Sequence, residues 1–330
     1  MTPLQFYTQV LAQLQVTERW CIASVVQTRG STPRKKGAQM AVALGSDGTL
    51  IAPIASVGGG AGEAKVLQAA AALLRSPTLQ SEALEIDLSG QAGPEKSSSG
   101  SRGATSGVCG GHMRLCLSTF CKADLHQRAQ AINESLKAGK VTTIDVVTLL
   151  PADQSTSECL CLVPAPMCLI GGGGHCGVAL AELLVRLGFP VAVIDERDEV
   201  FGCTLSPEFE ISTSSDWTSA LKAAKDHQQH GAPRAMAVLL SRSYSHDLTA
   251  LHAIAQSEVE FSLIGMMGSA RRIRLVKQQL TEFPAALLAV LKAPIGLSIG
   301  AETPSEIAVS IAAELLSVRS AGFPSNPISA

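Results

Sequence analysis

The clearest structural signal in the sequence is Leu169-Ile170-Gly171-Gly172-Gly173-Gly174-His175-Cys176-Gly177. An apolar segment at 178–187 follows it and leads into Val191-Ala192-Val193-Ile194-Asp195. An apolar run, a glycine cluster, a helical apolar segment and a second apolar run predict a strand, a tight turn, a helix and another strand. The stretch therefore predicts half of a nucleotide-binding fold.

The glycines of this stretch fit the pattern G-x-G-x-x-G at Gly172, Gly174 and Gly177. In that pattern the first glycine makes the turn, the second lets a pyrophosphate approach the backbone, and the third lets the helix pack on the strand. Asp195 ends the second strand, where an acidic residue would meet a ribose hydroxyl. These residues are candidate nucleotide contacts.

Strand and helix patterns continue to alternate after this unit. Helical patterns cover 217–225, 247–255 and 271–280, and strand patterns cover 235–240 and 261–264. This alternation predicts a parallel, doubly wound sheet, whose ligands bind at the carboxyl ends of the strands. The candidate contacts at the later junctions are Arg197, Gly265, Gly268, Ser269 and Arg271.

Arg271 and Arg272 stand at the start of a predicted helix, where cations oppose the helix dipole. One interpretation is a solvated helix face. The other is an anionic partner that compensates the unfavourable position.

The first half of the chain predicts a separate mixed α/β domain. Its helical patterns cover 4–14, 64–74 and 124–138, and its strand patterns cover 20–28, 40–44, 50–57, 82–88, 113–117 and 142–149. We therefore expect an α/β protein with an N-terminal mixed α/β domain at 1–150, a linker at 151–166, a C-terminal Rossmann-like doubly wound parallel sheet at 167–320 and a flexible tail at 321–330.

A loop at 29–38 combines turn-forming residues with four cations, among them Arg34. A solvated surface loop is the usual fate of such a run, and it is the interpretation that the sequence favours. An anion-binding loop is the alternative, because small residues expose backbone N–H groups beside fixed positive charge.

A second glycine-rich turn, Gly58-Gly59-Gly60, leads from a strand pattern into a helix that carries Glu63. A tight turn that needs positive φ is one interpretation. Three successive glycines exceed what a turn requires, and helix N-termini attract anions. We therefore expect a ligand to lie against this backbone.

Cys109 precedes Gly110 and Gly111 at the end of a polar, Gly/Ser-rich segment at 89–107. That segment has few apolar residues, which predicts a loop or lid. A buried, inert thiol is the default for a cysteine, but this junction between a loop and a strand permits an exposed, reactive one.

The bulk composition excludes several classes of protein. A formal net charge of -2 argues against broad nucleic-acid or membrane-surface binding, and no apolar stretch is long enough to span a bilayer. We therefore expect a cytoplasmic protein. The nine cysteines match no common zinc pattern, so we expect most of them to be small buried hydrophobic residues.

The motifs also form an ordered set. In the first half the set comprises 28–34 with Gly37, Ala38 and Met40, then Gly58-Gly59-Gly60 with Glu63, and Cys109-Gly110-Gly111. In the second half it comprises Gly172-Gly173-Gly174-His175 with Gly177, Asp195 and Arg197, then 264–269 and 294–310. Across nearly its whole length the chain resembles the XdhC/CoxI family, the accessory factors of xanthine dehydrogenase and related molybdenum hydroxylases.

The resemblance implies a two-domain chaperone that binds the molybdenum cofactor (molybdopterin) transiently and protects it. Such a protein would present the cofactor to a cysteine desulfurase for sulfuration and insert it into the apo molybdenum hydroxylase. The implied cofactor contacts are the 58–60 turn and Cys109 to Gly111, with Cys109 as the candidate molybdenum contact. The implied Rossmann site, Gly172 to Gly177 with Asp195, would take NAD(P) or another nucleotide. The apolar composition also makes us expect a homodimer.

The chain departs from the family pattern at two positions. Some relatives have a cysteine where this chain has Gly60, which leaves Cys109 alone as the metal contact. Relatives commonly have a histidine where Tyr244 stands.

Two alternative functions remain at the level of sequence. The first is an NAD(P)-dependent oxidoreductase, for which His175 or His246 would be the proton donor. The second is a redox-sensing binding module that uses Cys109.

Overall fold

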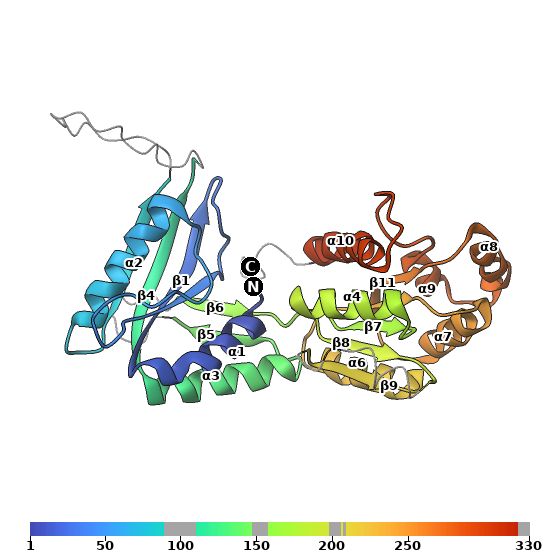
Figure 1. The fold of residues 1–330 in the computed structure, drawn as a ribbon, viewed down its shortest axis with the longest axis horizontal. Coiled ribbons are helices and arrows are strands. Elements are labelled where there is room, and N and C mark those ends of the chain that lie inside the picture. Colours follow the sequence, from blue (N-terminus) through green and yellow to red (C-terminus); the bar gives the residue numbers. More distant parts are fainter. Residues whose placement is uncertain (89–109, 147–157, 198–205, 207–208, 323–330) are drawn as a thin grey trace. The chain divides into compact units, whose positions relative to one another are not determined.

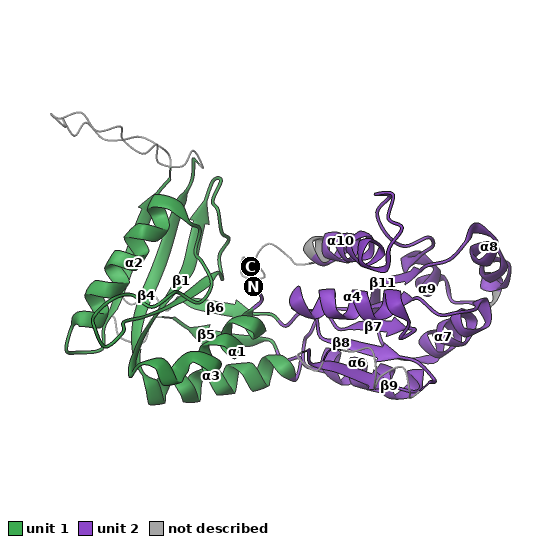
Figure 2. Cartoon of the chain, viewed as in Figure 1, with its two compact units in different colours: residues 1, 3–137, 141–163 green, residues 2, 138–140, 164–330 purple. Residues whose placement is uncertain are grey.

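A computed structural model describes residues 1–88, 110–146, 158–197, 206 and 209–322. The chain divides into two compact units (Figure 2). Unit 1 comprises residues 1, 3–137 and 141–163, and unit 2 comprises residues 2, 138–140 and 164–330. The flexible tail expected from 321 lies almost wholly outside the described residues, as do Cys109 and the loop expected at 89–107.

Unit 1 is built on an antiparallel sheet of four strands in the order β2-β1-β4-β3 (Figure 1). A short antiparallel pair, β5 and β6, lies in the same unit. The elements of unit 1 are α1 (Pro3–Gln13), a 3-10 turn (Leu14–Val16), β1 (Arg19–Arg29), β2 (Gln39–Ala43), α2 (Gly60–Arg75), β3 (Ser81–Asp87), β4 (His112–Cys121), α3 (Lys122–Lys137), β5 (Thr142–Asp145) and β6 (Cys159–Leu162).

The alternating side chains of β1 supply both cores of unit 1. Trp20 and Ile22 pack with α1, α3 and the β5–β6 pair on one face of the sheet. Cys21, Ala23 and Val25 pack with α2 on the other face. Strand β1 is therefore covered on both sides, which explains the nearly continuous buried run from Trp20 to Val26.

The strand predicted at 50–57 is wrong. Two isolated bridges, Ala41 with Ile54 and Leu44 with Leu50, take the place of a regular ladder between this segment and β2. Pro53 has no backbone N–H to donate, and Ala55 has a φ of 63°, which a regular strand does not allow. The segment that we expected to be a linker contains β6, and the boundary between the units falls at 163/164.

Unit 2 contains one sheet of six parallel strands in the order β12-β11-β10-β7-β8-β9. This is the Rossmann order, so the predicted doubly wound parallel sheet is confirmed. Its elements are β7 (Cys168–Gly171), α4 (His175–Arg186), β8 (Val191–Ile194), β9 (Ile211–Ser214), α6 (Trp217–Gln229), β10 (Ala235–Leu239), α7 (Tyr244–Gln256), β11 (Phe261–Met266), α8 (Ala270–Gln279), a 3-10 turn (Leu280–Glu282), α9 (Ala285–Val290), β12 (Leu291–Lys292) and α10 (Pro304–Gly322).

Helices cover both faces of this sheet (Figure 1). Helices α4 and α10 pack on one face, and α6, α7, α8 and α9 pack on the other. The start of α10 is fixed by a capping box, because Thr303 accepts a hydrogen bond from the Glu306 N–H and Glu306 accepts one from the Thr303 N–H.

The glycine turn between β7 and α4 brings the helix very close to the strand. Gly172 has a φ of 118°, and a Cβ there would lie 2.7 Å from the carbonyl oxygen of Leu240. A Cβ at Gly177 would lie only 1.8 Å from the carbonyl oxygen of Gly172. Gly174 has an extended backbone, and a Cβ there would meet nothing within 4 Å. The first and third glycines therefore fix the turn and the packing, and the second leaves open space.

This geometry predicts opposite outcomes for two glycine substitutions in the same turn. Gly177→Ala should destabilise the protein by about 3 kcal/mol or more, because the methyl group overlaps a backbone oxygen. Gly174→Ala should cost less than about 1 kcal/mol, because its methyl group enters open space. Urea unfolding of the two variants measures the difference. Equal losses of stability would contradict this account of the turn.

Candidate functional site

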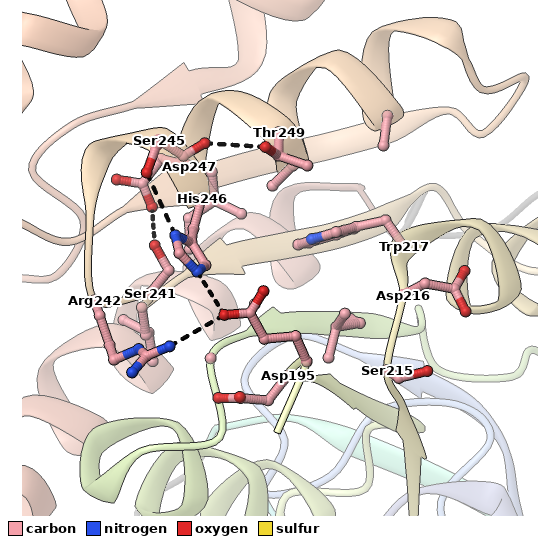
Figure 3. A pocket seen from close by; sticks show the side chains of 18 of the residues that line it. Asp195, Ser215, Asp216, Trp217, Ser241, Arg242, Ser245, His246, Asp247 and Thr249 are labelled. Atoms are coloured by element: carbon pink, nitrogen blue, oxygen red, sulfur yellow. Dashed lines mark hydrogen bonds and ion pairs between the residues drawn. The ribbon is translucent and has the colours of Figure 1, made fainter. Parts of the chain in front are cut away.

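A cavity of about 480 Å³ opens at the carboxyl ends of β7, β8 and β10, between α6 and α7 (Figure 3). The predicted residues Gly172, Gly174, Asp195 and Arg197 line it. Its position matches the rule that ligands of such sheets bind where the strand order reverses. The volume is in the range of small-molecule sites.

Asp195 holds the glycine turn and Arg197 at the edge of this cavity. Its Oδ2 accepts hydrogen bonds from the Gly173 N–H at 2.8 Å and from Arg197 Nη2 at 2.8 Å. Its Oδ1 accepts from Arg197 Nε at 2.8 Å and from the Arg197 N–H at 3.1 Å. The side chain of Asp195 is 7% exposed.

These four bonds use the acceptor positions that a carboxylate offers. A ribose hydroxyl could bond to Asp195 only by replacing one of them. The Arg197 guanidinium, followed by the other hydrogen bonds, lowers the pKa of Asp195 to about 2. In this structure Asp195 therefore acts as a clamp on the turn, and its predicted contact with a ribose hydroxyl stays a prediction.

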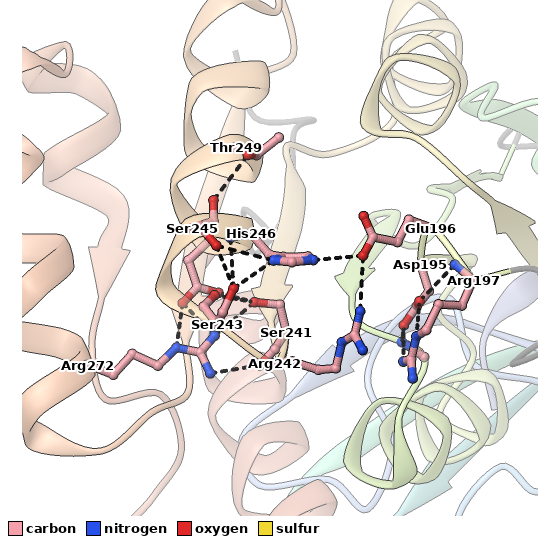
Figure 4. A network of polar contacts seen from close by, with 12 residues as sticks. Asp195, Glu196, Arg197, Ser241, Arg242, Ser243, Ser245, His246, Thr249 and Arg272 are labelled. Atoms are coloured by element: carbon pink, nitrogen blue, oxygen red, sulfur yellow. Dashed lines mark hydrogen bonds and ion pairs between the residues drawn. The ribbon is translucent and has the colours of Figure 1, made fainter.

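A second polar network joins the ends of β8 and β10 at the rim of the cavity (Figure 4). Glu196 Oε1 accepts a hydrogen bond from Arg242 Nη2 at 3.1 Å and lies 2.9 Å from His246 Nε2. The Nδ1 atom of His246 lies 2.7 Å from Ser243 Oγ, and this serine caps α7. The hydrogen bond from His246 lowers the pKa of Glu196.

A buried ionic cluster supports the floor of this region. Asp247 is fully buried, and its carboxylate accepts from Ser241 Oγ at 2.6 Å and from Arg272 Nε at 2.7 Å. Arg272 also donates to the Ser241 carbonyl oxygen at 2.7 Å. The anionic partner that we considered for the arginine pair is thus, for Arg272, a carboxylate of the chain itself.

The other predicted residues of unit 2 lie outside the lining of the cavity. Gly265 admits the side chain of Ile295, and Ser269 caps α8 by accepting from the Arg272 N–H. Gly268 packs beside the Arg272 side chain. Arg271 and His175 are exposed at the first residues of α8 and α4.

Trp217 is the main lining residue that the sequence analysis missed. It is the first residue of α6, and its indole points into the cavity (Figure 3). A Cβ at Gly171 would lie 2.6 Å from Trp217 Cζ2, so this glycine makes room for the ring. A residue that closely follows a strand of a parallel sheet is a candidate lining residue. Trp217 could not be recognised in this way, because β9 was not predicted from the sequence.

In unit 1 the structure brings three predicted segments together. A Cβ at Gly111 would lie 2.3 Å from the Ser31 carbonyl oxygen, so residues 110–111 pack directly on the loop at 29–38. A Cβ at Gly58 would lie 2.7 Å from Pro33 Cγ, so the 58–60 turn packs on the same loop. Both contacts require glycine, because any side chain would overlap the loop.

The 58–60 turn opens α2 and is held by Glu63. Glu63 Oε2 accepts a hydrogen bond from the Gly59 N–H at 3.1 Å and another from the Ser56 hydroxyl. Gly59 and Gly60 have φ values of 85° and 64° and nothing within 4 Å of a Cβ position. The turn therefore leaves open space at the start of α2. Glu63, in the first turn of the same helix, holds the turn through its hydrogen bonds to Ser56 and Gly59.

The loop at 29–38 carries its positive charge on exposed side chains. Arg29, Arg34, Lys35 and Lys36 are all exposed. Within the described ranges none of the four forms an ion pair. The loop therefore presents uncompensated cations beside two glycine segments, which is the arrangement that the anion-binding interpretation requires.

Cys109, the candidate molybdenum contact and redox residue, lies outside the described residues, directly before Gly110. Among the residues that the structure describes, no three His, Cys, Asp or Glu side chains could jointly hold a metal ion. In that same part of the chain, no helix combines the length and apolar character that a membrane crossing demands.

Comparisons with known protein families agree with the division of the chain into two units. Residues 168–315 match the XdhC Rossmann domain, and residues 14–83 match the XdhC and CoxI family. The chain belongs to the XdhC and CoxI family. The predicted family resemblance is therefore confirmed, and each match falls within one of the two units.

Two curated relatives and one solved structure are similar to the chain. It is 31% identical over 156 residues to the uncharacterized protein YqeB of Escherichia coli (strain K12), covering 47% of this chain and 27% of the relative. It is 29% identical over 181 residues to a probable xanthine dehydrogenase subunit of Bacillus subtilis (strain 168), covering 54% of this chain and 50% of the relative. The chain thus matches half or less of each relative's length.

The solved structure is a crystal structure of a xanthine dehydrogenase from Bacillus halodurans, with a TM-score of 0.72 and 22% identity. The match covers 100% of this chain and 99% of that one. At this identity the likeness shows a shared fold.

The low pKa of Asp195 predicts how acid affects unit 2. A carboxyl whose pKa is lower in the folded than in the unfolded protein stabilises the fold above the unfolded value and loses that contribution as pH falls through the folded value. With a folded pKa of about 2 against an ordinary 3.8, Asp195 should contribute on the order of 2 kcal/mol at neutral pH. Asp195→Asn should remove this contribution.

Urea unfolding followed by tryptophan fluorescence at several pH values measures the effect. The stability difference between the wild type and Asp195→Asn should be constant from pH 7 to about pH 5 and shrink below about pH 4. A difference that stays constant down to pH 3 would show that the Asp195–Arg197 pair does not stabilise the fold in this way.

Proposed function

We propose that this chain is an accessory protein of a xanthine dehydrogenase type hydroxylase, and that it carries the molybdenum cofactor to that enzyme. The family membership and the Bacillus subtilis relative, named as part of a probable xanthine dehydrogenase, support the accessory role. The carrier role rests on one observation. Unit 1 presents uncompensated cations against an open glycine turn.

The cofactor fits this surface by its chemistry. Its pterin carries a phosphate, or a dinucleotide, and both are anions that exposed backbone N–H groups and cations bind. Gly59 and Gly60 leave the space that a side chain would fill, and Arg34 lies in the adjoining loop. A cofactor bound there would also carry a dithiolene and a molybdenum atom. We propose the Cys109 thiol as the contact for the metal.

The same proposal covers the cofactor's handling after binding. The chain would shield the cofactor, present it to a cysteine desulfurase for sulfuration and release it into the apo-hydroxylase. We also propose that it acts as a homodimer. In this proposal Cys109 protects the metal end of the cofactor. We favour this role over the alternative of an independent redox-sensing module.

The NAD(P)-dependent oxidoreductase is the weaker alternative. In an NAD site the acidic residue after the second strand accepts from the ribose hydroxyls, whereas Asp195 is engaged by Gly173 and Arg197. The two candidate proton donors do not favour the reaction, for different reasons. His246 lines the cavity but is bonded to Glu196 and Ser243, and His175 is exposed and lies outside the cavity lining. Among the described residues, no contact in the cavity favours hydride transfer.

Cofactor retention tests the carrier role directly. Purified chain is mixed with molybdenum cofactor released from a molybdenum enzyme and passed through gel filtration, and the protein peak is assayed for molybdenum and for pterin fluorescence. The wild type should retain both. The double variant Arg34→Glu, Lys36→Glu should retain about tenfold less, because two charge-assisted contacts become repulsive.

A matched control separates this effect from a general change of charge. Lys137→Glu with Lys140→Glu makes the same change of charge at two exposed positions, the last residue of α3 and a residue three positions beyond it, and should retain the cofactor as the wild type does. A wild type that retains neither molybdenum nor pterin would refute the carrier role. Equal losses in both double variants would refute the assignment to the loop at 29–38.

A further inference from the structure

One wall of the cavity of unit 2 is formed by a residue outside the glycine motif. The indole of Trp217 forms that wall from the start of α6, while α7 lines the cavity with the short side chains of Thr249, Ala250 and Ala253. An aromatic ring on one side and small side chains on another leave space for a flat group. Figure 3 shows the indole between the residues of α7 and the strand ends that carry Asp195.

The placement of this ring is built into the fold. Trp217 packs over Gly171, the last residue of β7, where any side chain would displace it. Asp216, the residue before Trp217, caps α6 by accepting a hydrogen bond from the Ser219 N–H at 2.9 Å. The ring is therefore held between a strand end and a capped helix start. In the described part of the chain, its N–H has no hydrogen-bond partner.

The rest of the cavity lining complements a sugar phosphate. Gly174 leaves open space at the amino end of α4, where backbone N–H groups attract a phosphate. The usual acceptor for a ribose diol, Asp195, has its acceptor positions filled. Affinity for a nucleotide must then come from its phosphate and its base, with little from the ribose hydroxyls.

We propose that this cavity binds a nucleoside 5′-phosphate with its base stacked on Trp217 and its phosphate at the amino end of α4. The site is distinct from the proposed cofactor surface of unit 1 and needs no molybdenum. Trp217 is the specificity-determining residue, because a stacked base gains affinity that a sugar phosphate alone does not. Stacking of this kind accepts any flat base.

Comparing a nucleotide with its base-free counterpart tests the stack. Isothermal titration of the full chain should show that adenosine 5′-phosphate binds at least about fivefold more tightly than ribose 5-phosphate. In Trp217→Leu that advantage should fall to within about twofold, while Trp217→Phe, which keeps a flat ring, should retain most of it. Trp20→Phe is the control, because Trp20 is 1% exposed in the core of unit 1.

A third ligand tests the role assigned to Asp195. The 2′-deoxy form of adenosine 5′-phosphate should bind within about twofold of the ribose form, because Asp195 has no vacant acceptor for the hydroxyl. A deoxy form that binds tenfold more weakly would overturn this part of the inference. The base stack would be overturned if the wild type did not prefer adenosine 5′-phosphate to ribose 5-phosphate, or if Trp217→Leu kept the preference.

These outcomes are separate from those of the carrier test. Nucleotide binding by a chain that retains no molybdenum or pterin would refute the carrier role and leave the nucleotide site standing. Cofactor retention without a preference for the base would do the reverse.

Discussion

The close approach of α4 to β7 is the constraint on which the site of unit 2 depends. The helix lies so near the strand that a single methyl group at Gly177 would overlap the carbonyl oxygen of Gly172. This contact fixes where α4 begins and so fixes where its amino end faces the cavity. Asp195 then ties the turn to the end of β8 through the Gly173 N–H. Turn, helix start and neighbouring strand are therefore held as one piece.

A comparable constraint organises unit 1 without any Rossmann motif. Its loop at 29–38 is contacted by two glycine segments that lie far apart in the sequence, at Gly58 and at Gly111. Each contact is between groups that only a glycine allows to meet. The result gathers exposed cations beside an open turn, although the sequence favoured a simple solvated loop. The two sites therefore differ in kind, since the site of unit 2 is a cavity and the site of unit 1 is a charged surface.

Much of this fold could be predicted because its signals are local. The apolar runs of β7, β8, β10 and β11 and the glycine turn were sufficient to predict a parallel doubly wound sheet. The strands that escaped prediction are short or partly exposed: β6 has four residues, three of the four residues of β9 are polar, and β12 has two residues. Such strands are defined by the neighbours they pair with, and pairing is not visible in a single sequence.

The candidate site shows the same division between local and distant signals. Gly172, Gly174, Asp195 and Arg197 were found because a local motif marks them. Trp217 was missed because its meaning depends on the unforeseen strand β9, which carries it to the carboxyl edge of the sheet. The partners of Asp195 and Arg272 were likewise out of reach, since they depend on which strand ends meet.

In the proposed carrier role, the cofactor binds at the charged surface of unit 1. Hydrogen–deuterium exchange of the full chain, with and without added molybdenum cofactor, tests it most directly. We expect slower exchange on cofactor addition at 29–38 and at 58–63, where backbone N–H groups would meet the phosphate. Slower exchange confined to the glycine turn of unit 2, or no change in either unit 1 segment, would contradict it.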